Sequence, residues 1–117
     1  MQIQFNTDAS VQGSDSMTEW ATREVSERLS RFRDSITRVE VHMTDVNGTR
    51  HADNDKRCLL EIRLSGRQPQ SVTHTASKVT DALTGACAKA QNLLETLMGK
   101  ERDANRRDSI RGASAAE

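Results

Sequence analysis

Apolar and polar residues alternate in three segments of the chain, which is the pattern of a strand with one buried side and one solvent-facing side. A fourth segment follows Pro69 and is rich in β-branched residues, which favours a short strand at a sheet edge. The third segment has the clearest pattern, because Cys58 and Ile62 fall on its inward side and Glu61 on its outward side. The four predicted strands are 2–7, 38–44, 57–64 and 71–75.

Two other segments carry apolar residues at the spacing of an amphipathic helix. The first is predicted at 15–33, with Ser16 and Glu19 forming a capping box at its start. The second follows Ser77, and its apolar stripe includes small residues that permit close approach to a sheet. Gly99 is predicted to end this helix, because glycine is common directly after a helix C-terminus.

The predicted order of elements is β-α-β-β-β-α, which indicates an α+β two-layer sandwich: a four-stranded sheet with two helices packed on one face. A single domain of this kind is expected at 1–100. Residues 101–117 hold one aliphatic residue larger than alanine, Ile110, and are predicted to form a flexible polar tail. Turn-forming residues between Asp45 and Lys56 predict a long, mobile hairpin loop.

The balance of charged residues limits which classes of function this chain can have. Seventeen Lys and Arg residues stand against seventeen Asp and Glu residues, which excludes a nucleic-acid binder that works by bulk positive charge. Aromatic residues make up 3% of the chain, too few for a sheet that stacks RNA bases on exposed rings. The two cysteines and the lack of a signal segment favour a cytoplasmic protein, and no apolar stretch is long enough to span a membrane.

Candidate groups for catalysis or metal binding are three histidines, two cysteines and scattered carboxylates, and none of them forms a known short motif. His42, His51 and His74 lie in different predicted elements. Cys58 and Cys87 are far apart in the sequence, at inward or apolar positions where a free cysteine usually acts as a small hydrophobe. The sequence therefore predicts no metal site, no cofactor, no small-molecule substrate and no enzyme activity.

Basic residues gather at the end of the first predicted helix and on the exposed side of the second, and they include Arg28, Arg31 and Lys89. From spacing alone, a solvated helix surface is the more common explanation, and arginine also suits a helix C-terminus. The alternative is that a layer of two helices holds the phosphates of a folded RNA by shape, without base stacking.

A set of short segments can be compared with a known family: 1–3, 28–32, 36–41, 82–83 and Lys89. Together they resemble the short form of the ribosome hibernation-promoting factor family, which includes the ribosome-associated inhibitor. The resemblance covers about residues 1–100 and implies a small cytoplasmic, non-enzymatic protein of stress or stationary phase. It also implies binding to the small ribosomal subunit in the decoding channel, where the family inhibits translation by blocking tRNA and mRNA. Arg28, Arg31 and Lys89 fall at the positions of the family's rRNA-contacting basic residues.

The chain departs from this family pattern on the second predicted helix, where it has Asn92, Glu95 and Thr96 in place of further basic residues. A second hypothesis therefore stays open: a divergent, non-enzymatic protein-interaction module of the same fold that has lost the rRNA surface and uses the exposed sheet face. The two hypotheses differ in salt dependence, because phosphate contacts weaken steeply with salt. The sequence leaves the oligomeric state open.

Overall fold

The computed structural model describes residues 1–7, 14–45 and 56–116, with side chains as far as residue 99. The predicted mobile hairpin loop between Asp45 and Lys56 lies outside these ranges. Within them, in chain order, the elements are β1 (Gln2–Thr7), α1 (Asp15–Arg28), the 3-10 turn η1 (Ser30–Phe32), β2 (Ile36–Asp45), β3 (Lys56–Leu64), β4 (Gln70–Ala76) and α2 (Val79–Ala116).

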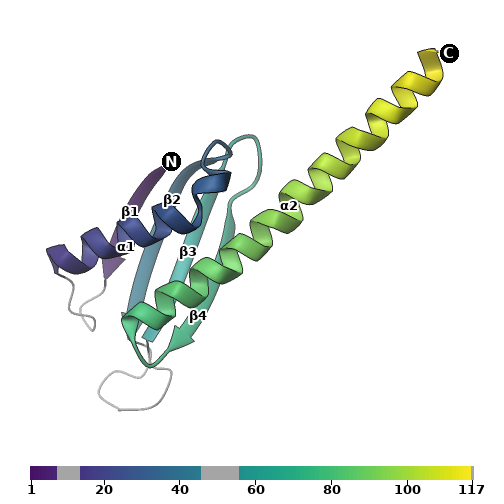
Figure 1. The fold of residues 1–117 in the computed structure, drawn as a ribbon. Helices are drawn as coiled ribbons and strands as arrows, with labels where there is room; N and C mark the ends of the chain where they lie inside the picture. Colours follow the sequence, from purple (N-terminus) through teal and green to yellow (C-terminus); the bar gives the residue numbers. More distant parts are fainter. Residues whose placement is uncertain (8–13, 46–55, 117) are drawn as a thin grey trace.

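The strands form one mixed sheet in the order β1-β2-β3-β4, with both helices on the same face (Figure 1). β1 pairs in parallel with β2, whereas β2 with β3 and β3 with β4 are antiparallel. A parallel pair requires a crossover connection, and α1 provides it. The predicted α+β two-layer sandwich with the order β-α-β-β-β-α is therefore confirmed.

Strand alternation decides which side chains enter the core between the sheet and the helices. The register places Leu60 opposite Val41 and Ile62 opposite Val39, and all four side chains are fully buried. Burying one such side chain stabilises a fold by about 1.5–3 kcal/mol relative to leaving it exposed. The helices close this core with fully buried residues from their apolar stripes: Ala21, Val25 and Leu29, and Ala82, Leu83, Ala86, Cys87, Ala90 and Leu94.

The start of α1 differs from the prediction. Its N-cap is Ser14, which has an extended backbone (φ −129°, ψ 163°). The Ser14 hydroxyl accepts a hydrogen bond from the Met17 amide at 3.1 Å, which satisfies one of the free amides of the first turn. Ser16 lies inside that turn, so the predicted capping box of Ser16 and Glu19 is wrong.

The C-terminal ends of both helices also differ from the prediction. α1 ends at Arg28 instead of running through η1, because Leu29 (φ −105°, ψ 11°) leaves α-helical geometry. α2 continues past Gly99 to Ala116, so the predicted helix end at Gly99 is wrong. Gly99 does not adopt the positive φ of a terminating glycine. A glycine within a helix costs about 1 kcal/mol relative to alanine, which need not end it.

The C-terminal part of α2 projects beyond the sheet (Figure 1). Its backbone is helical from residue 101 to Ala116. The division into a domain at 1–100 and a flexible polar tail at 101–117 stays a prediction. None of the helices in the described ranges combines the length and apolar character needed to cross a membrane.

Candidate functional site

Arg28 and Arg31 lie where the first helical segment ends, next to α2. Arg28 closes α1, and its guanidinium pairs with Glu24 one turn earlier. The hydrogen bond from Arg28 to Glu24 raises the pKa of Arg28, and a guanidinium is in any case cationic at neutral pH. Arg31 belongs to η1 and pairs with Glu95 of α2. The structure therefore brings these two predicted residues to one flank of α2, each beside a carboxylate.

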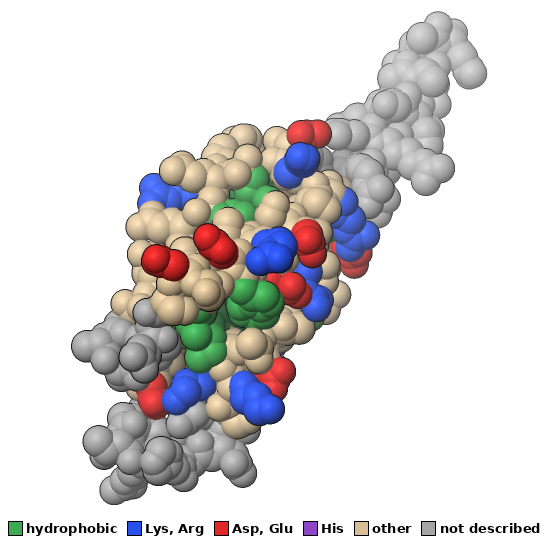
Figure 2. Space-filling view, turned by 60° about the vertical axis from the view of Figure 1, so that its left-hand side comes forward, with side chains coloured by type: hydrophobic (Ala, Val, Ile, Leu, Met, Phe, Trp, Pro, Cys, Tyr) green, Lys and Arg blue, Asp and Glu red, His purple; other side chains and the backbone are tan. Residues whose placement is uncertain are grey.

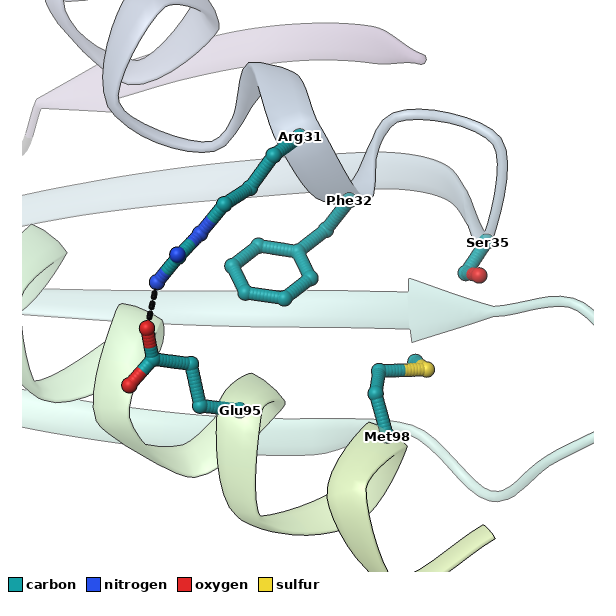
Figure 3. Close-up of a pocket in the computed structure, with 5 residues that line it drawn as sticks. All are labelled: Arg31, Phe32, Ser35, Glu95 and Met98. Atoms are coloured by element: carbon teal, nitrogen blue, oxygen red, sulfur yellow. Dashed lines mark ion pairs between the residues drawn. The ribbon is translucent and has the colours of Figure 1, made fainter. Parts of the chain in front are cut away.

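Arg31 stands at the rim of a hollow of about 470 Å³ between η1 and α2 (Figure 3). Its guanidinium carbon lies 4.8 Å from the centre of the Phe32 ring, which is a favourable cation–π distance. The ring and the Glu95 carboxylate together hold the guanidinium in place. Ser35 and Met98 complete the lining. The hollow thus presents one cation, one carboxylate and one hydroxyl beside apolar surface.

Both arginine pairs are accessible enough to exchange partners. The Arg31 and Glu95 side chains are 58% and 49% exposed, and those of Arg28 and Glu24 are 37% and 22% exposed. Ion pairs at the surface contribute about 0–1 kcal/mol. A phosphate group can therefore replace either carboxylate with little loss of stability, and arginine binds phosphate in a bidentate manner.

Lys89 lies on the side of α2 that faces β4. Its Nζ donates a hydrogen bond to the main-chain carbonyl of Thr73 at 2.8 Å. β4 is an edge strand, and a lysine held there discourages pairing with another strand. An ammonium group has three donors, so Lys89 keeps donors for a second partner. The structure does not bring Lys89 to the flank that carries Arg28 and Arg31.

The outer surface of α2 lacks further cations at the three positions where the chain departs from the family pattern. Asn92, Glu95 and Thr96 are all exposed. On the side of the molecule shown in Figure 2, Lys and Arg side chains alternate with Asp and Glu side chains. This side of the molecule thus carries separate cations with carboxylates between them, and this agrees with the zero net charge of the chain.

Gln91 makes a contact that the sequence analysis did not single out. Its Nε2 donates a hydrogen bond to the main-chain carbonyl of Arg28 at 2.7 Å. Carbonyls at the end of a helix lack partners within the helix, so this side chain caps α1 from α2. The bond joins the two helices next to the Arg31–Glu95 pair. Its only signal in the sequence is a polar residue beside the apolar stripe of α2.

The two cysteines are free and buried. Burial raises the pKa of the Cys58 thiol to about 12 and that of the Cys87 thiol to about 11. Both thiols are therefore protonated at neutral pH, whereas a reactive cysteine requires a thiolate. Their predicted placement as small buried hydrophobes is confirmed.

His42 lies beside two carboxylates on the face of the sheet that the helices leave open. Glu40 precedes His42 by two residues on β2, and Glu61 on the neighbouring strand β3 lies directly opposite Glu40. One ligand atom from each of these residues lies within 4.8 Å of the others. No metal site was predicted from the sequence, because ligand residues are not closely spaced along the chain, and this cluster forms only when β2 pairs with β3. His74 instead packs against Gly85 of α2, and the third histidine lies outside the described residues.

Two solved structures of other proteins share this fold. The sequence matches no family model and no curated protein sequence. The structure of the N-terminal domain of Protein Y from Thermus thermophilus matches with a TM-score of 0.66 and 12% identity, covering 83% of this chain and 99% of that chain. A ribosomal subunit interface protein from Coxiella burnetii matches with a TM-score of 0.69 and 15% identity, covering 85% of this chain and 99% of that chain. The chain therefore has the fold of both proteins.

Proposed function

We propose that this chain is a cytoplasmic, ribosome-associated factor that binds the small subunit and inhibits translation in stress or stationary phase. The observation that carries the proposal is the fold shared with the ribosomal subunit interface protein of Coxiella burnetii, of which 99% is covered. The resemblance of residues 28–32 and 36–41 to the hibernation-factor family supports the same role. In this proposal the protein acts without a cofactor, a small-molecule substrate or a catalytic step.

The proposed mechanism is occlusion of the decoding channel by a domain that rRNA phosphates hold in place. Arg28 and Arg31 exchange their carboxylate partners for phosphates on one flank of α2, and Lys89 contacts the rRNA from the other flank. Such contacts recognise the shape of a folded RNA without reading its bases. A domain seated in the channel excludes tRNA and mRNA by its volume.

The zero net charge of the chain limits the number of groups that can supply binding energy toward RNA. A chain without bulk positive charge gains affinity only from the few cations that reach phosphates. Each phosphate contact contributes about 0.7–0.9 to the slope of log affinity against log salt. The proposal therefore predicts a measurable slope that falls when individual cations are removed.

Co-sedimentation with purified small subunits over a salt series tests the proposal. The test variant is Arg28→Ala/Arg31→Ala, and the matched control is Arg57→Ala/Arg63→Ala, which removes two exposed arginines from the open sheet face. We expect the wild type to bind at low salt, the control to bind equally, and the test variant to bind weakly with a slope reduced by about 1.4–1.8. Lys89→Ala alone should give a smaller reduction.

Two results would contradict the proposal. If the wild type does not bind small subunits at low salt, the ribosomal role is wrong. If the sheet-face control loses binding while the helix-face variant keeps it, the chain acts through its open sheet on a protein partner, as the alternative hypothesis states.

A further inference from the structure

The open face of the sheet carries two carboxylates and one imidazole side by side. Glu40 and His42 are two residues apart on β2, so both point away from the helices. Glu61 lies directly opposite Glu40 on β3. All three residues are half-buried. A ligand atom from each lies within 4.8 Å of those of the other two.

The two opposed carboxylates, Glu40 and Glu61, repel each other. Like charges directly opposite each other on neighbouring strands destabilise a sheet. Arg38 offsets part of the repulsion, because its Nη2 lies 3.0 Å from Glu40 Oε1. Within the described part of the chain, no ion pair is found for Glu61. Among the described residues, Glu61 therefore has no cation within ion-pair distance.

The imidazole supplies a second and independent observation. His42 Nε2 is buried, with less than 1 Å² exposed, and it has no hydrogen-bond partner. Buried polar atoms are nearly always satisfied, so an unpaired one calls for a missing partner. It lies 4.0 Å from Glu40 Oε2. The His42 side chain as a whole is 34% exposed, so an ion can reach this cluster from solvent.

We propose that Glu40, His42 and Glu61 bind a divalent transition-metal ion, with Zn²⁺ as the representative. Imidazole nitrogen and carboxylate oxygen bind zinc at about 2.0–2.2 Å, so two ligands of one tetrahedral ion lie about 3.4 Å apart. The observed 4.0 Å between His42 and Glu40 is close to this value, and small side-chain rotations close the difference. The ion also neutralises the opposed carboxylates and supplies the partner that His42 Nε2 lacks.

The ligand set also defines which ions are excluded. Three side-chain ligands that include an imidazole suit Zn²⁺ and its neighbours in the transition series, whereas Mg²⁺ and Ca²⁺ prefer sites made of oxygen alone. The fourth coordination position is left to water. The site lies on the face opposite the helices, so it does not depend on the proposed rRNA contacts.

Titration calorimetry of the full chain with zinc chloride tests this site. We expect one Zn²⁺ per chain in the wild type, at least tenfold weaker binding in His42→Gln and in Glu61→Gln, and no binding of Mg²⁺. His51→Gln is the matched control, because it removes one imidazole and leaves Glu40, His42 and Glu61 intact. Zn²⁺ should also raise the Tm of the wild type and leave that of both cluster variants unchanged, and circular dichroism verifies that each variant is folded.

Cobalt supplies a spectroscopic test of the ligand identity. Co²⁺ bound by the cluster should show a ligand-field spectrum without thiolate charge-transfer bands, since no cysteine takes part. The proposal is overturned if the wild type does not bind Zn²⁺ or if the cobalt spectrum contains a thiolate band. It is also overturned if His51→Gln abolishes binding while both cluster variants retain it.

Discussion

Replacing Glu95 with glutamine tests whether Arg31 is a group that engages rRNA. Arg31 pairs with Glu95 in the free protein, so a phosphate that binds Arg31 must first displace this carboxylate. Glutamine keeps nearly the same side-chain size and removes the charge. We therefore predict that Glu95→Gln binds small ribosomal subunits more tightly than the wild type.

The exposure of the pair sets the magnitude of this effect. With 58% and 49% of the two side chains exposed, the pair falls in the class of surface ion pairs worth about 0.2–1 kcal/mol. Removing that competition lowers the Kd by about 1.4- to 5-fold. Glu95→Lys adds a cation at the same place, and one extra phosphate contact should steepen the salt slope by about 0.7–0.9.

Equilibrium binding of labelled protein to purified small subunits at several salt concentrations measures both quantities. Glu27→Gln is the matched control, because Glu27 is an exposed carboxylate of α1 that does not pair with Arg31. The reasoning is refuted if Glu95→Gln binds no more tightly than the wild type. It is refuted equally if Glu27→Gln strengthens binding by the same factor, since the effect would then be one of net charge.

Further predictions concern stability. A Cβ at Gly85 would lie 2.0 Å from Cδ2 of His74, so Gly85→Ala should destabilise the fold by about 1–3 kcal/mol in urea unfolding. Adding His74→Ala to Gly85→Ala should recover most of the lost stability. If it does not, the packing of His74 against Gly85 is contradicted. Ser14→Ala should cost about 1 kcal/mol in thermal unfolding and Ser14→Asp much less, because only the alanine removes the cap of α1. Burial raises the thiol pKa from 9.0 to about 12 in Cys58 and to about 11 in Cys87. The contribution of the two buried thiols to the free energy of unfolding should therefore be complete below pH 9 and be lost as the pH rises toward these values. A thiol reagent at pH 8 should label the native protein slowly and the denatured protein fast, and rapid native labelling would contradict their burial.

The strands could be predicted from the sequence because their period decides which side chains are buried. A two-residue alternation allows one assignment of faces, and the residues expected to point inward on β3 are the buried ones. The helix ends were predicted less well, because they depend on the backbone conformation of single residues. Ser14 and Ser16 are both acceptable caps by type, and only the extended backbone of Ser14 decides between them.

The candidate site was predicted as a set of residues but not as an arrangement. Arg28 and Arg31 could be grouped because they are close in the chain, and their role in binding stays a prediction. The partner of Arg31 comes from α2, and only the packing of that helix against η1 brings Glu95 to it. The same packing turns Lys89 toward β4. The cluster around His42 was missed because it depends on the pairing register of β2 and β3.

Photocrosslinking most directly tests the claim that the helix face contacts rRNA. A photoreactive amino acid is placed at Ser30 in η1 or at Thr75 on the open sheet face, both exposed positions, and each protein is irradiated with purified small subunits. We predict crosslinks from position 30 to the rRNA of the small subunit and none from position 75. Crosslinks from position 75 to a ribosomal protein, with none from position 30, would contradict the account and place the contact on the sheet.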